Sequence, residues 1–159
     1  MSIPSSAATL LSPPAGFICR PLAITDYERY LPLLAQLTTV GEISREAWTA
    51  RFRSLDPTAY FIYVIEETST KELVSAASLI VEQKFIHQCG SVGHIEDVVT
   101  DQRYRGRRLG QYVVRCLCDL ARGKGCYKVI LDCKDSIQPF YQSCGFERGG
   151  SEMTLYFHH

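Results

Sequence analysis

The stretch that most constrains the fold runs from Ile95 to Arg122, because a β-prone run, a basic turn and an amphipathic segment follow one another directly. The run 95–99 places β-branched residues around two acids, which is typical of a strand. Beyond the turn, apolar residues recur at spacings of three and four, which predicts a helix with one buried face. These residues are Leu109, Val113, Cys116, Leu117 and Leu120. Gly123 then stands where a glycine that ends a helix is expected.

The turn between strand and helix is a candidate anion site. A helix N-terminus presents unpaired N–H groups and a partial positive charge. Gly106 and Gly110 leave room for an anion to approach the backbone. Four arginines add formal charge, namely Arg103, Arg105, Arg107 and Arg108. A phosphate or pyrophosphate is the simplest ligand, although a surface loop rich in arginine stays open at this point. The pattern is neither a P-loop nor a dinucleotide fingerprint.

The order of the remaining elements predicts the fold class. In sequence order they are a strand 17–21, helices 26–37 and 44–52, a hairpin of strands 60–66 and 73–82, an outward extension 84–87, a connector 89–93, a strand 128–133 buried on both faces, a short helix 136–144 and two short strands within 146–157. We expect Thr25 to cap the first helix and Pro32 to kink or split it. The order predicts an α/β fold with a mixed sheet flanked by helices, whose parallel crossover spans 95–133.

Composition limits the classes of function. The chain has 159 residues, 46% of them apolar and 21% charged, which fits one globular domain. A formal net charge of zero argues against nucleic acid as a partner, and the apolar runs are too short to span a membrane. The seven cysteines show no C-x-x-C pair, so we expect buried thiols in an intracellular, reducing compartment. The cytoplasm is favoured and a microbody stays open. Residues 1–15 read as a disordered tail before a single domain, 16–159.

The strand, turn and helix resemble the acetyl-CoA pyrophosphate loop of the GNAT acetyltransferase superfamily, whose pattern is Arg/Gln-x-x-Gly-x-Gly/Ala. Arg103, Gly106 and Arg108 match it, with Arg108 in place of the small residue. Five further motifs, in order and at compatible spacing, resemble the glucosamine-6-phosphate N-acetyltransferase family. They are Leu37–Gly41, Lys84–His87, Gly93–Val99, Gly125–Cys133 and Phe140–Phe146.

The resemblance implies the GNAT fold, a central mixed sheet flanked by helices. It also implies transfer of acetyl from acetyl-CoA to the amine of D-glucosamine 6-phosphate, a step of UDP-N-acetylglucosamine biosynthesis, by a homodimer with a shared active site. No metal is implied, since no His, Cys or Asp set has ligand spacing. Three alternatives stay open: a GNAT acting on another small amine such as a polyamine or an antibiotic, a GNAT acting on a protein terminus, and a module that binds CoA without catalysis.

The resemblance also implies roles for single residues. Those that would bind acetyl-CoA are Val98, Val99, Arg105, Gly106, Arg107, Arg108, Leu109, Gly110, Gln111, Ser136 and Tyr141. Val98 and Val99 would act through their backbone, which requires an unpaired strand edge such as a β-bulge or splay provides. Tyr141 would meet the leaving sulfur, because a phenol with a pKa near 10 can donate to the thiolate of a thiol with a pKa near 8.5. Asp132 would orient the amine or take its proton, and a helix-capping role for it is equally open.

The acceptor would need cations for its phosphate and acids or carbonyls for its hydroxyls. The residues implied to bind it are Thr38, Lys84, Phe85, Ile86, His87, Glu96, Asp97, Val98, Tyr127 and Lys128. Because consecutive strand residues face opposite ways, Glu96 and Asp97 cannot both point side chains at one place on a regular strand. Some family members end with an arginine that reaches the phosphate, whereas this chain has Leu155-Tyr156-Phe157 there.

Overall fold

The computed structural model describes residues 12–157, in which five strands form one sheet in the order β1-β2-β3-β4-β5. Neighbours are antiparallel except β4 and β5, which are parallel. The strands are β1 (Phe17–Pro21), β2 (Tyr60–Glu67), β3 (Leu73–Gln83), β4 (Ser91–Thr100) and β5 (Cys126–Ile130). The predicted mixed α/β fold is confirmed. The predicted disordered tail falls mostly on residues 1–11, outside the described residues, and stays a prediction.

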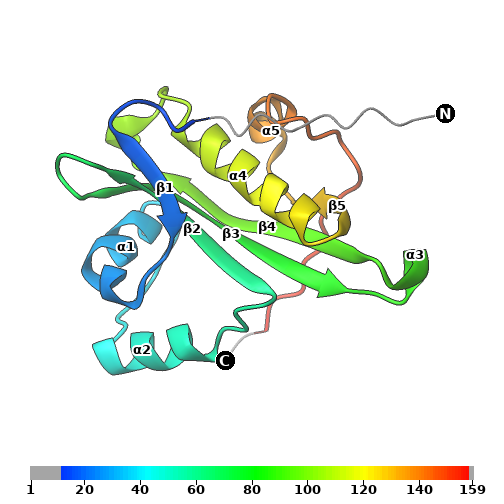
Figure 1. Ribbon diagram of the computed structural model, residues 1–159, viewed down its shortest axis with the longest axis horizontal. Helices are drawn as coiled ribbons and strands as arrows, with labels where there is room; N and C mark the ends of the chain where they lie inside the picture. Colours follow the sequence, from blue (N-terminus) through cyan, green and yellow to red (C-terminus); the bar gives the residue numbers. More distant parts are fainter. Residues whose placement is uncertain (1–11, 158–159) are drawn as a thin grey trace.

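The helices cover both faces of the sheet. They are α1 (Tyr27–Leu34), α2 (Arg45–Ser54), the single turn α3 (Ile86–Cys89), α4 (Leu109–Gly123) and α5 (Gln138–Gln142). Short 3₁₀ turns precede α1, α4 and α5 at Ile24–Asp26, Gln102–Tyr104 and Asp135–Ile137. Helix α4 lies along one face, α1 and α2 lie at the other, and α3 marks the far tip of the β3–β4 hairpin (Figure 1). No helix among residues 12–157 is long and apolar enough to cross a membrane.

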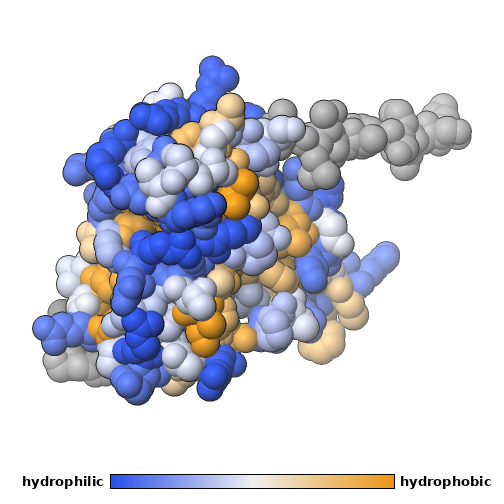
Figure 2. Space-filling view, turned by 60° about the vertical axis from the view of Figure 1, so that its left-hand side comes forward, coloured by the Kyte–Doolittle hydropathy of each residue, from blue (hydrophilic) through white to orange (hydrophobic). Residues whose placement is uncertain are grey.

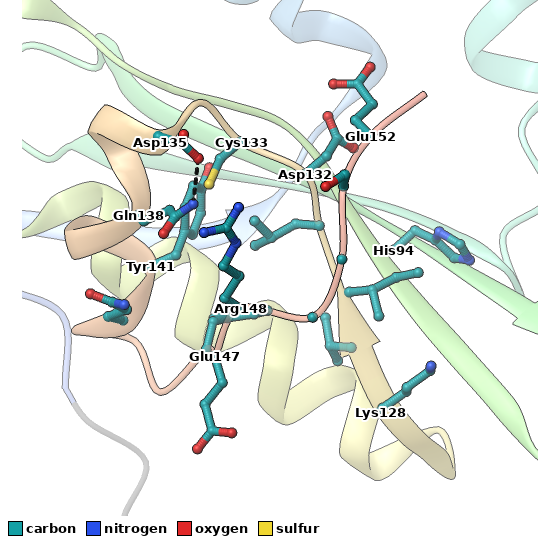
Figure 3. Close-up of a pocket in the computed structure, with 18 of the residues that line it drawn as sticks. His94, Lys128, Asp132, Cys133, Asp135, Gln138, Tyr141, Glu147, Arg148 and Glu152 are labelled. Atoms are coloured by element: carbon teal, nitrogen blue, oxygen red, sulfur yellow. Dashed lines mark hydrogen bonds between the residues drawn. The ribbon is translucent and has the colours of Figure 1, made fainter. Parts of the chain in front are cut away.

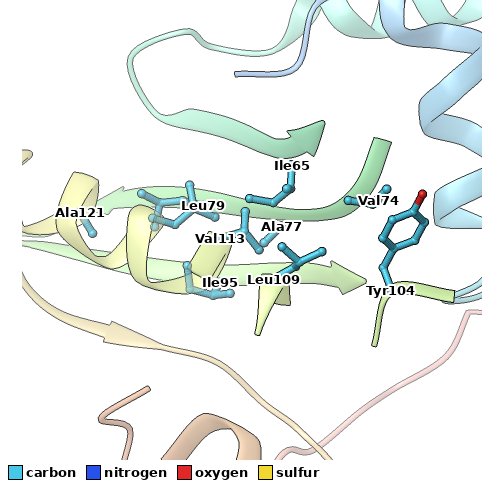
Figure 4. Packing of buried hydrophobic residues seen from close by; sticks show 10 residues of the cluster. Ile65, Val74, Ala77, Leu79, Ile95, Tyr104, Leu109, Val113 and Ala121 are labelled. Atoms are coloured by element: carbon cyan, nitrogen blue, oxygen red, sulfur yellow. The ribbon is translucent and has the colours of Figure 1, made fainter. Parts of the chain in front are cut away.

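Two apolar clusters fill the space between the helices and the sheet. Under α4, the buried Leu109 and Val113 pack against strand residues such as Ile65 and Leu79 (Figure 4). Leu117 belongs to the same cluster. The predicted amphipathic helix is therefore confirmed, because its apolar stripe is the face that meets the sheet. On the opposite face, α1 and α2 bring Tyr30, Leu33 and Trp48 against Val64, Ala76 and Val99.

The first helix differs from the prediction at its start. Thr25 does not cap it; the buried Asp26 accepts the backbone N–H of Ala23 at 2.7 Å instead. Pro32 lies inside α1 and does not split it, since the helix runs without a break from Tyr27 to Leu34. The second helix begins as predicted, with the Ser44 hydroxyl accepting the N–H of Ala47 at 3.1 Å.

Three predicted boundaries in the second half of the chain are wrong. The connector 89–93 belongs largely to β4, because Ser91–Gly93 pair with β3. Gly123 is the last residue of α4, and the chain reverses at Gly125, which has a left-handed φ of 81°. The fifth strand ends at Ile130 rather than Cys133 and is partly exposed, since β5 is an edge strand of the sheet.

The two strands predicted within 146–157 do not form in this single chain. The segment instead runs extended past β5, with Met153, Leu155, Tyr156 and Phe157 at least 77% exposed. A strand forms only where a neighbouring strand accepts its hydrogen bonds, and β-prone composition does not supply that neighbour.

A network of buried charges joins the start of α1 to the sheet. Arg20 of β1 donates to Asp26 at 2.8 Å and to Glu66 of β2 at 2.7 Å. The Asp26 side chain is fully buried and that of Glu66 is 8% exposed. Burial acts to raise the pKa of Asp26, but hydrogen bonds from Arg20 and Ala23 lower it overall. The hydrogen bond from Arg20 likewise lowers the pKa of Glu66.

Replacing Arg20 by methionine leaves Asp26 and Glu66 with only the more exposed Arg29, and Lys71 at Glu66, as partners, so we expect it to lower the free energy of unfolding at pH 7 by about 3 kcal/mol. Both carboxyls have folded pKa values below the ordinary 3.8 and 4.5, so this stabilisation is present above those values and lost as the pH falls through the folded values. Urea unfolding of both proteins should therefore show a difference that shrinks as the pH falls below 4.5 and 3.8, the ordinary values of the two carboxyls. Arg122→Met, at an exposed pair with Asp119, serves as control and should cost under about 1 kcal/mol. A pH-independent difference would contradict the assignment.

Candidate active site

Strands β4 and β5 separate halfway along β4. Their pairing runs from Ser91↔Cys126 to His94↔Ile130 and ends there. From Ile95 to Thr100, β4 has β3 on one side and no strand of residues 12–157 on the other. Backbone groups that face the missing neighbour are left free to bind a ligand. The predicted unpaired strand edge is therefore present.

A β-bulge accompanies this opening. Along β3 the step from Ala76 to Ser78 is two residues, whereas their partners Val99 and Glu96 are three residues apart. The extra residue falls at Asp97–Val98, and Asp97 has a φ of 51°, which non-glycine residues rarely adopt. Val98 and Val99 pack into the two apolar clusters on opposite faces of the sheet, so their side chains are structural and only their backbone remains for a ligand.

The basic turn leads from the open end of β4 into α4. Gly106 has a φ of 80° and Arg108, the residue before the helix, a φ of 62°. Arg105, Arg107 and Arg108 are exposed and form no ion pair with the described residues. The face that carries this turn and the β2–β3 turn comes forward in Figure 2 and is mostly hydrophilic. Free positive charge therefore surrounds the N-terminus of a 15-residue helix, as an anion site requires.

Arg103 does not contribute to that free charge. It pairs with Asp101 at 3.0 Å and with Glu72 at 3.1 Å. Asp101 also accepts the backbone N–H of Arg103 at 2.8 Å, and the hydrogen bonds from Arg103 lower the pKa of Asp101 to about 2. Arg103 thus fixes the shape of the turn rather than offering charge to a ligand.

Helix α5 packs against the first turn of α4. A Cβ on Gly110 would lie 2.9 Å from Thr100 Oγ1 and 3.2 Å from Phe140 Cζ, so only glycine allows this approach. The Gln111 side chain donates to Ser143 Oγ at 2.7 Å, and Arg115 donates to the Ser143 carbonyl at 2.7 Å. The missing Cβ of Gly110 and the side chain of Gln111 therefore serve this packing, which leaves their backbone N–H groups for a ligand.

A pocket of about 640 Å³ lies where β4 and β5 separate (Figure 3). It is lined by His94 and Glu96 of β4, by residues 128–133 of β5 and its continuation, by Asp135, Gln138, Tyr141 and Gln142 at α5, and by residues 146–152 of the C-terminal segment. Four of the predicted site residues meet here, namely Glu96, Lys128, Asp132 and Tyr141. They come from β4, from β5 with its continuation, and from α5, so the fold brings Glu96 next to residues more than 30 positions further along the chain.

The pocket shifts the acid–base properties of two of these residues. Burial raises the pKa of Tyr141 to about 12, and the ring packs edge-on against Phe140 at 4.9 Å. Burial also raises the pKa of Glu96 above its ordinary value, and the charges of Asp132 and Asp97 raise it further. Tyr141 is therefore a neutral hydrogen-bond donor at pH 7, and Glu96 is a better proton acceptor than an ordinary glutamate.

Other predicted substrate residues lie outside this pocket. Lys84 pairs with Glu82 at 2.6 Å, and the His87 ring stacks on Tyr127 with centroids 4.2 Å apart. Phe85 is 94% exposed and Ile86 60% exposed at the tip of the β3–β4 hairpin. Thr38, after α1, is not among the lining residues either, and neither is Ser136, which was predicted to bind acetyl-CoA.

Most of the lining residues were not predicted as site residues, and three of them carry charged or imidazole groups suited to a polar acceptor: His94, Arg148 and Glu152. His94 alternates with Glu96 on one face of β4, a spacing that could have indicated it. Arg148 brings a cation to the pocket, and its side chain enters from the C-terminal segment in Figure 3. No local pattern marks Arg148 or Glu152, because the path of that segment places them.

Comparison with known proteins settles the family. The sequence model described as the acetyltransferase (GNAT) family matches residues 25–146, most of the chain. The chain belongs to the GNAT family. It is therefore an acetyl-CoA-dependent N-acetyltransferase, and the family and fold predicted from its motifs are confirmed.

Close relatives narrow the comparison within the GNAT family. The chain is 45% identical over 147 residues to the glucosamine 6-phosphate N-acetyltransferase of Candida albicans, covering 91% of this chain and 98% of that protein. It is 47% identical over 129 residues to a probable glucosamine 6-phosphate N-acetyltransferase of Drosophila melanogaster, covering 80% of this chain but only 59% of that longer protein. The crystal structure of the Arabidopsis thaliana glucosamine-6-phosphate N-acetyltransferase superposes with a TM-score of 0.87 at 40% identity, covering 89% of this chain and 99% of that one.

Gly110→Ala should disturb this GNAT site through packing alone. The added Cβ forces α4 away from Thr100 or Phe140, so we expect a loss of about 1–3 kcal/mol in the free energy of unfolding and a displaced α5. Gly123→Ala is the matched control in the same helix, because nothing lies within 4 Å of its Cβ. It should be neutral or stabilising by up to about 1 kcal/mol. Urea unfolding measures both, and equal effects of the two variants would refute the close approach.

Proposed function

We propose that this GNAT enzyme transfers acetyl from acetyl-CoA to the amine of D-glucosamine 6-phosphate, giving N-acetylglucosamine 6-phosphate and CoA. The observation that carries the proposal is the 45% identity that spans 98% of the Candida albicans enzyme of that name. The site geometry supports it. The basic turn before α4, the open edge of β4 and the polar pocket where β4 and β5 separate could bind the successive parts of the two substrates.

The residues fit acetyl-CoA. The N–H groups of the turn from Arg105 to Gln111 would hold its pyrophosphate, with three exposed arginines adding charge. The free edge of β4 would pair with the amide groups of the pantetheine arm, in the manner of an added strand. This arrangement directs the thioester along β4 towards Tyr141 and the pocket.

Two groups of the chain act on the thioester. Backbone N–H groups near Val98, at the open edge, would stabilise negative charge on the carbonyl oxygen. The Tyr141 hydroxyl would donate a hydrogen bond to the departing sulfur. Its pKa of about 12 exceeds the roughly 8.5 of an ordinary thiol, so a hydrogen bond is favoured over complete proton transfer.

The pocket has groups of both charges for the acceptor. Glu96, Asp132 and Glu152 lie on one side, where they would accept hydrogen bonds from the amine and ring hydroxyls. Lys128 and Arg148 supply cations for the phosphate. Glu96, with its raised pKa, is the carboxylate best suited to receive the amine proton directly or through water.

We also propose a homodimer in which each chain completes the other's site. The outer edge of β5 has no strand partner among residues 12–157, and the C-terminal segment beside it exposes four large apolar side chains. Two copies would cover both features by pairing these β-prone segments. The exposed tip at Phe85 and Ile86, with Lys84 and His87 beside it, would then reach the partner's pocket and take up the substrate roles predicted for it.

The seven cysteines of the described chain are all free thiols. This supports the proposal of a reducing intracellular compartment, with the cytoplasm favoured.

The substrate assignment is tested by thiol release from acetyl-CoA. With the purified protein, we expect release only when glucosamine 6-phosphate is added, and N-acetylglucosamine 6-phosphate as product by mass spectrometry. Glucosamine without the phosphate should lose at least tenfold in kcat/KM, because the cations of the pocket then stay unpaired. Spermidine and a peptide amine serve as competing acceptors. Release with either of these, and none with the sugar phosphate, would refute the assignment.

Tyr141→Phe removes one hydrogen bond to the leaving sulfur and nothing else from the pocket. We expect kcat to fall by about 10- to 100-fold while KM for acetyl-CoA changes little, since the contact forms mainly as the thiolate develops. Tyr63→Phe, on β2 outside the pocket, is the matched control and should leave kcat unchanged. Steady-state kinetics decide the matter, and an unchanged kcat in Tyr141→Phe would exclude Tyr141 from the chemical step.

A further inference from the structure

A side chain that follows the first helix reaches the start of the basic turn. Gln36 lies just after α1, and its amide makes two hydrogen bonds to the segment that follows β4. Its Nε2 donates to the Asp101 carboxylate at 3.1 Å, and its Oε1 accepts the backbone N–H of Gln102 at 3.0 Å. These partners are 65 and 66 positions away in the sequence. Gln36 does not line the pocket, so the site described above does not account for this bridge.

Both ends of the bridge are held in place. On the α1 side, the Gln36 N–H donates to the carbonyl of Leu33 at 3.1 Å, and Leu33 is buried in the apolar cluster under α1 and α2. On the other side, the Asp101 side chain is 7% exposed and also accepts from the guanidinium of Arg103 at 3.0 Å. A hydrogen bond to a charged, shielded acceptor is stronger than one between neutral exposed groups. The exposed Gln36 therefore has a fixed backbone and a strong acceptor.

The amide of Gln36 completes the 3₁₀ turn Gln102–Tyr104, which leads into the basic turn. The first N–H groups of a short helix have no partner within it. Here Gln36 accepts the N–H of Gln102, and the Asp101 carboxylate accepts that of Arg103 at 2.8 Å. The basic residues begin at the next position, so the orientation of this 3₁₀ turn determines where their N–H groups point.

We propose that Gln36 is a positioning residue of the acetyl-CoA site, which ties the basic turn to α1 and so holds its N–H groups in the arrangement that binds the pyrophosphate. The inference rests on the acetyl-CoA site proposed above. Gln36 acts through Asp101 and Gln102 rather than by contact with the donor. Its loss should therefore weaken binding of the phosphate-bearing part of acetyl-CoA and leave the chemistry at the thioester unchanged.

Gln36→Met tests the bridge, because it keeps the length of the side chain and removes both polar groups. We expect the Kd for CoA, measured by calorimetry, and the KM for acetyl-CoA to rise by about 5- to 20-fold, with kcat within about twofold of wild type. Gln36→Ala should behave alike, since it lacks the same two groups. Glu28→Met is the control: it removes a hydrogen bond of 2.7 Å from Arg45 of α2 to α1 and should leave all three constants unchanged.

A truncated donor separates positioning of the turn from a general loss of structure. S-acetyl-N-acetylcysteamine has the thioester but no phosphate, so it makes no contact with the basic turn. With this donor, Gln36→Met and the wild-type protein should agree in kcat/KM within about twofold. A variant with a damaged fold would instead lose activity with both donors.

Hydrogen exchange checks the bridge itself in solution. The Gln102 amide should exchange faster in Gln36→Met than in the wild-type protein, because its acceptor is gone. In Glu28→Met its exchange rate should stay as in the wild-type protein.

Four results would overturn the inference: unchanged CoA affinity in both Gln36 variants, an equal loss with both donors, unchanged exchange of the Gln102 amide, or loss of the fold in both variants by circular dichroism. The last would make Gln36 a residue of general stability. Failure of the proposed function looks different, since the wild-type protein itself would then bind no CoA or release no thiol from acetyl-CoA.

Discussion

The structure depends on one constraint in the sheet, namely that β5 stays paired with β4 only as far as His94 and Ile130. A continuous parallel pairing would have used every backbone group along the outer side of β4. The extra residue at Asp97, held at a left-handed φ, accompanies this separation and redirects the strand. What results is an open strand edge inside an otherwise ordinary sheet, which is the feature a thioester-binding site needs.

The other parts of the site follow from where β4 ends. Since α4 starts just beyond the open end of β4, its N-terminus and three free arginines lie where a ligand on the strand edge would leave the sheet. The close approach at Gly110 brings α5 onto the first turn of α4, and α5 carries Tyr141 to the pocket. This close packing, together with the hydrogen bonds from Gln111 and Arg115 to Ser143, links the candidate anion site to Tyr141, and it explains why a glycine stands at position 110.

Short sequence patterns correctly predicted the parts of the fold that depend on interactions between residues near one another in the chain. The apolar spacing of α4, the Ser44 cap of α2 and the β2–β3 hairpin all appear where expected. The predictions that were wrong concern segments whose structure depends on residues far away in the sequence. Strand β5 is an edge strand rather than a buried one, and the segment 146–157 has no strand to pair with. Arg148 lines the pocket because the C-terminal segment that carries it runs beside β5, and no short sequence pattern indicates that course. Lys84 and His87, conversely, match a family motif but lie at a hairpin tip outside this chain's pocket.

A crystal structure with CoA and N-acetylglucosamine 6-phosphate bound would show whether the open edge of β4 holds the acetyl donor. We expect the pyrophosphate within about 3 Å of backbone N–H groups between Gly106 and Gln111. We also expect the pantetheine arm along the free edge of β4 and the sulfur beside the Tyr141 hydroxyl. CoA bound elsewhere, or a further strand of the assembly paired with β4 between Ile95 and Thr100, would contradict this binding mode.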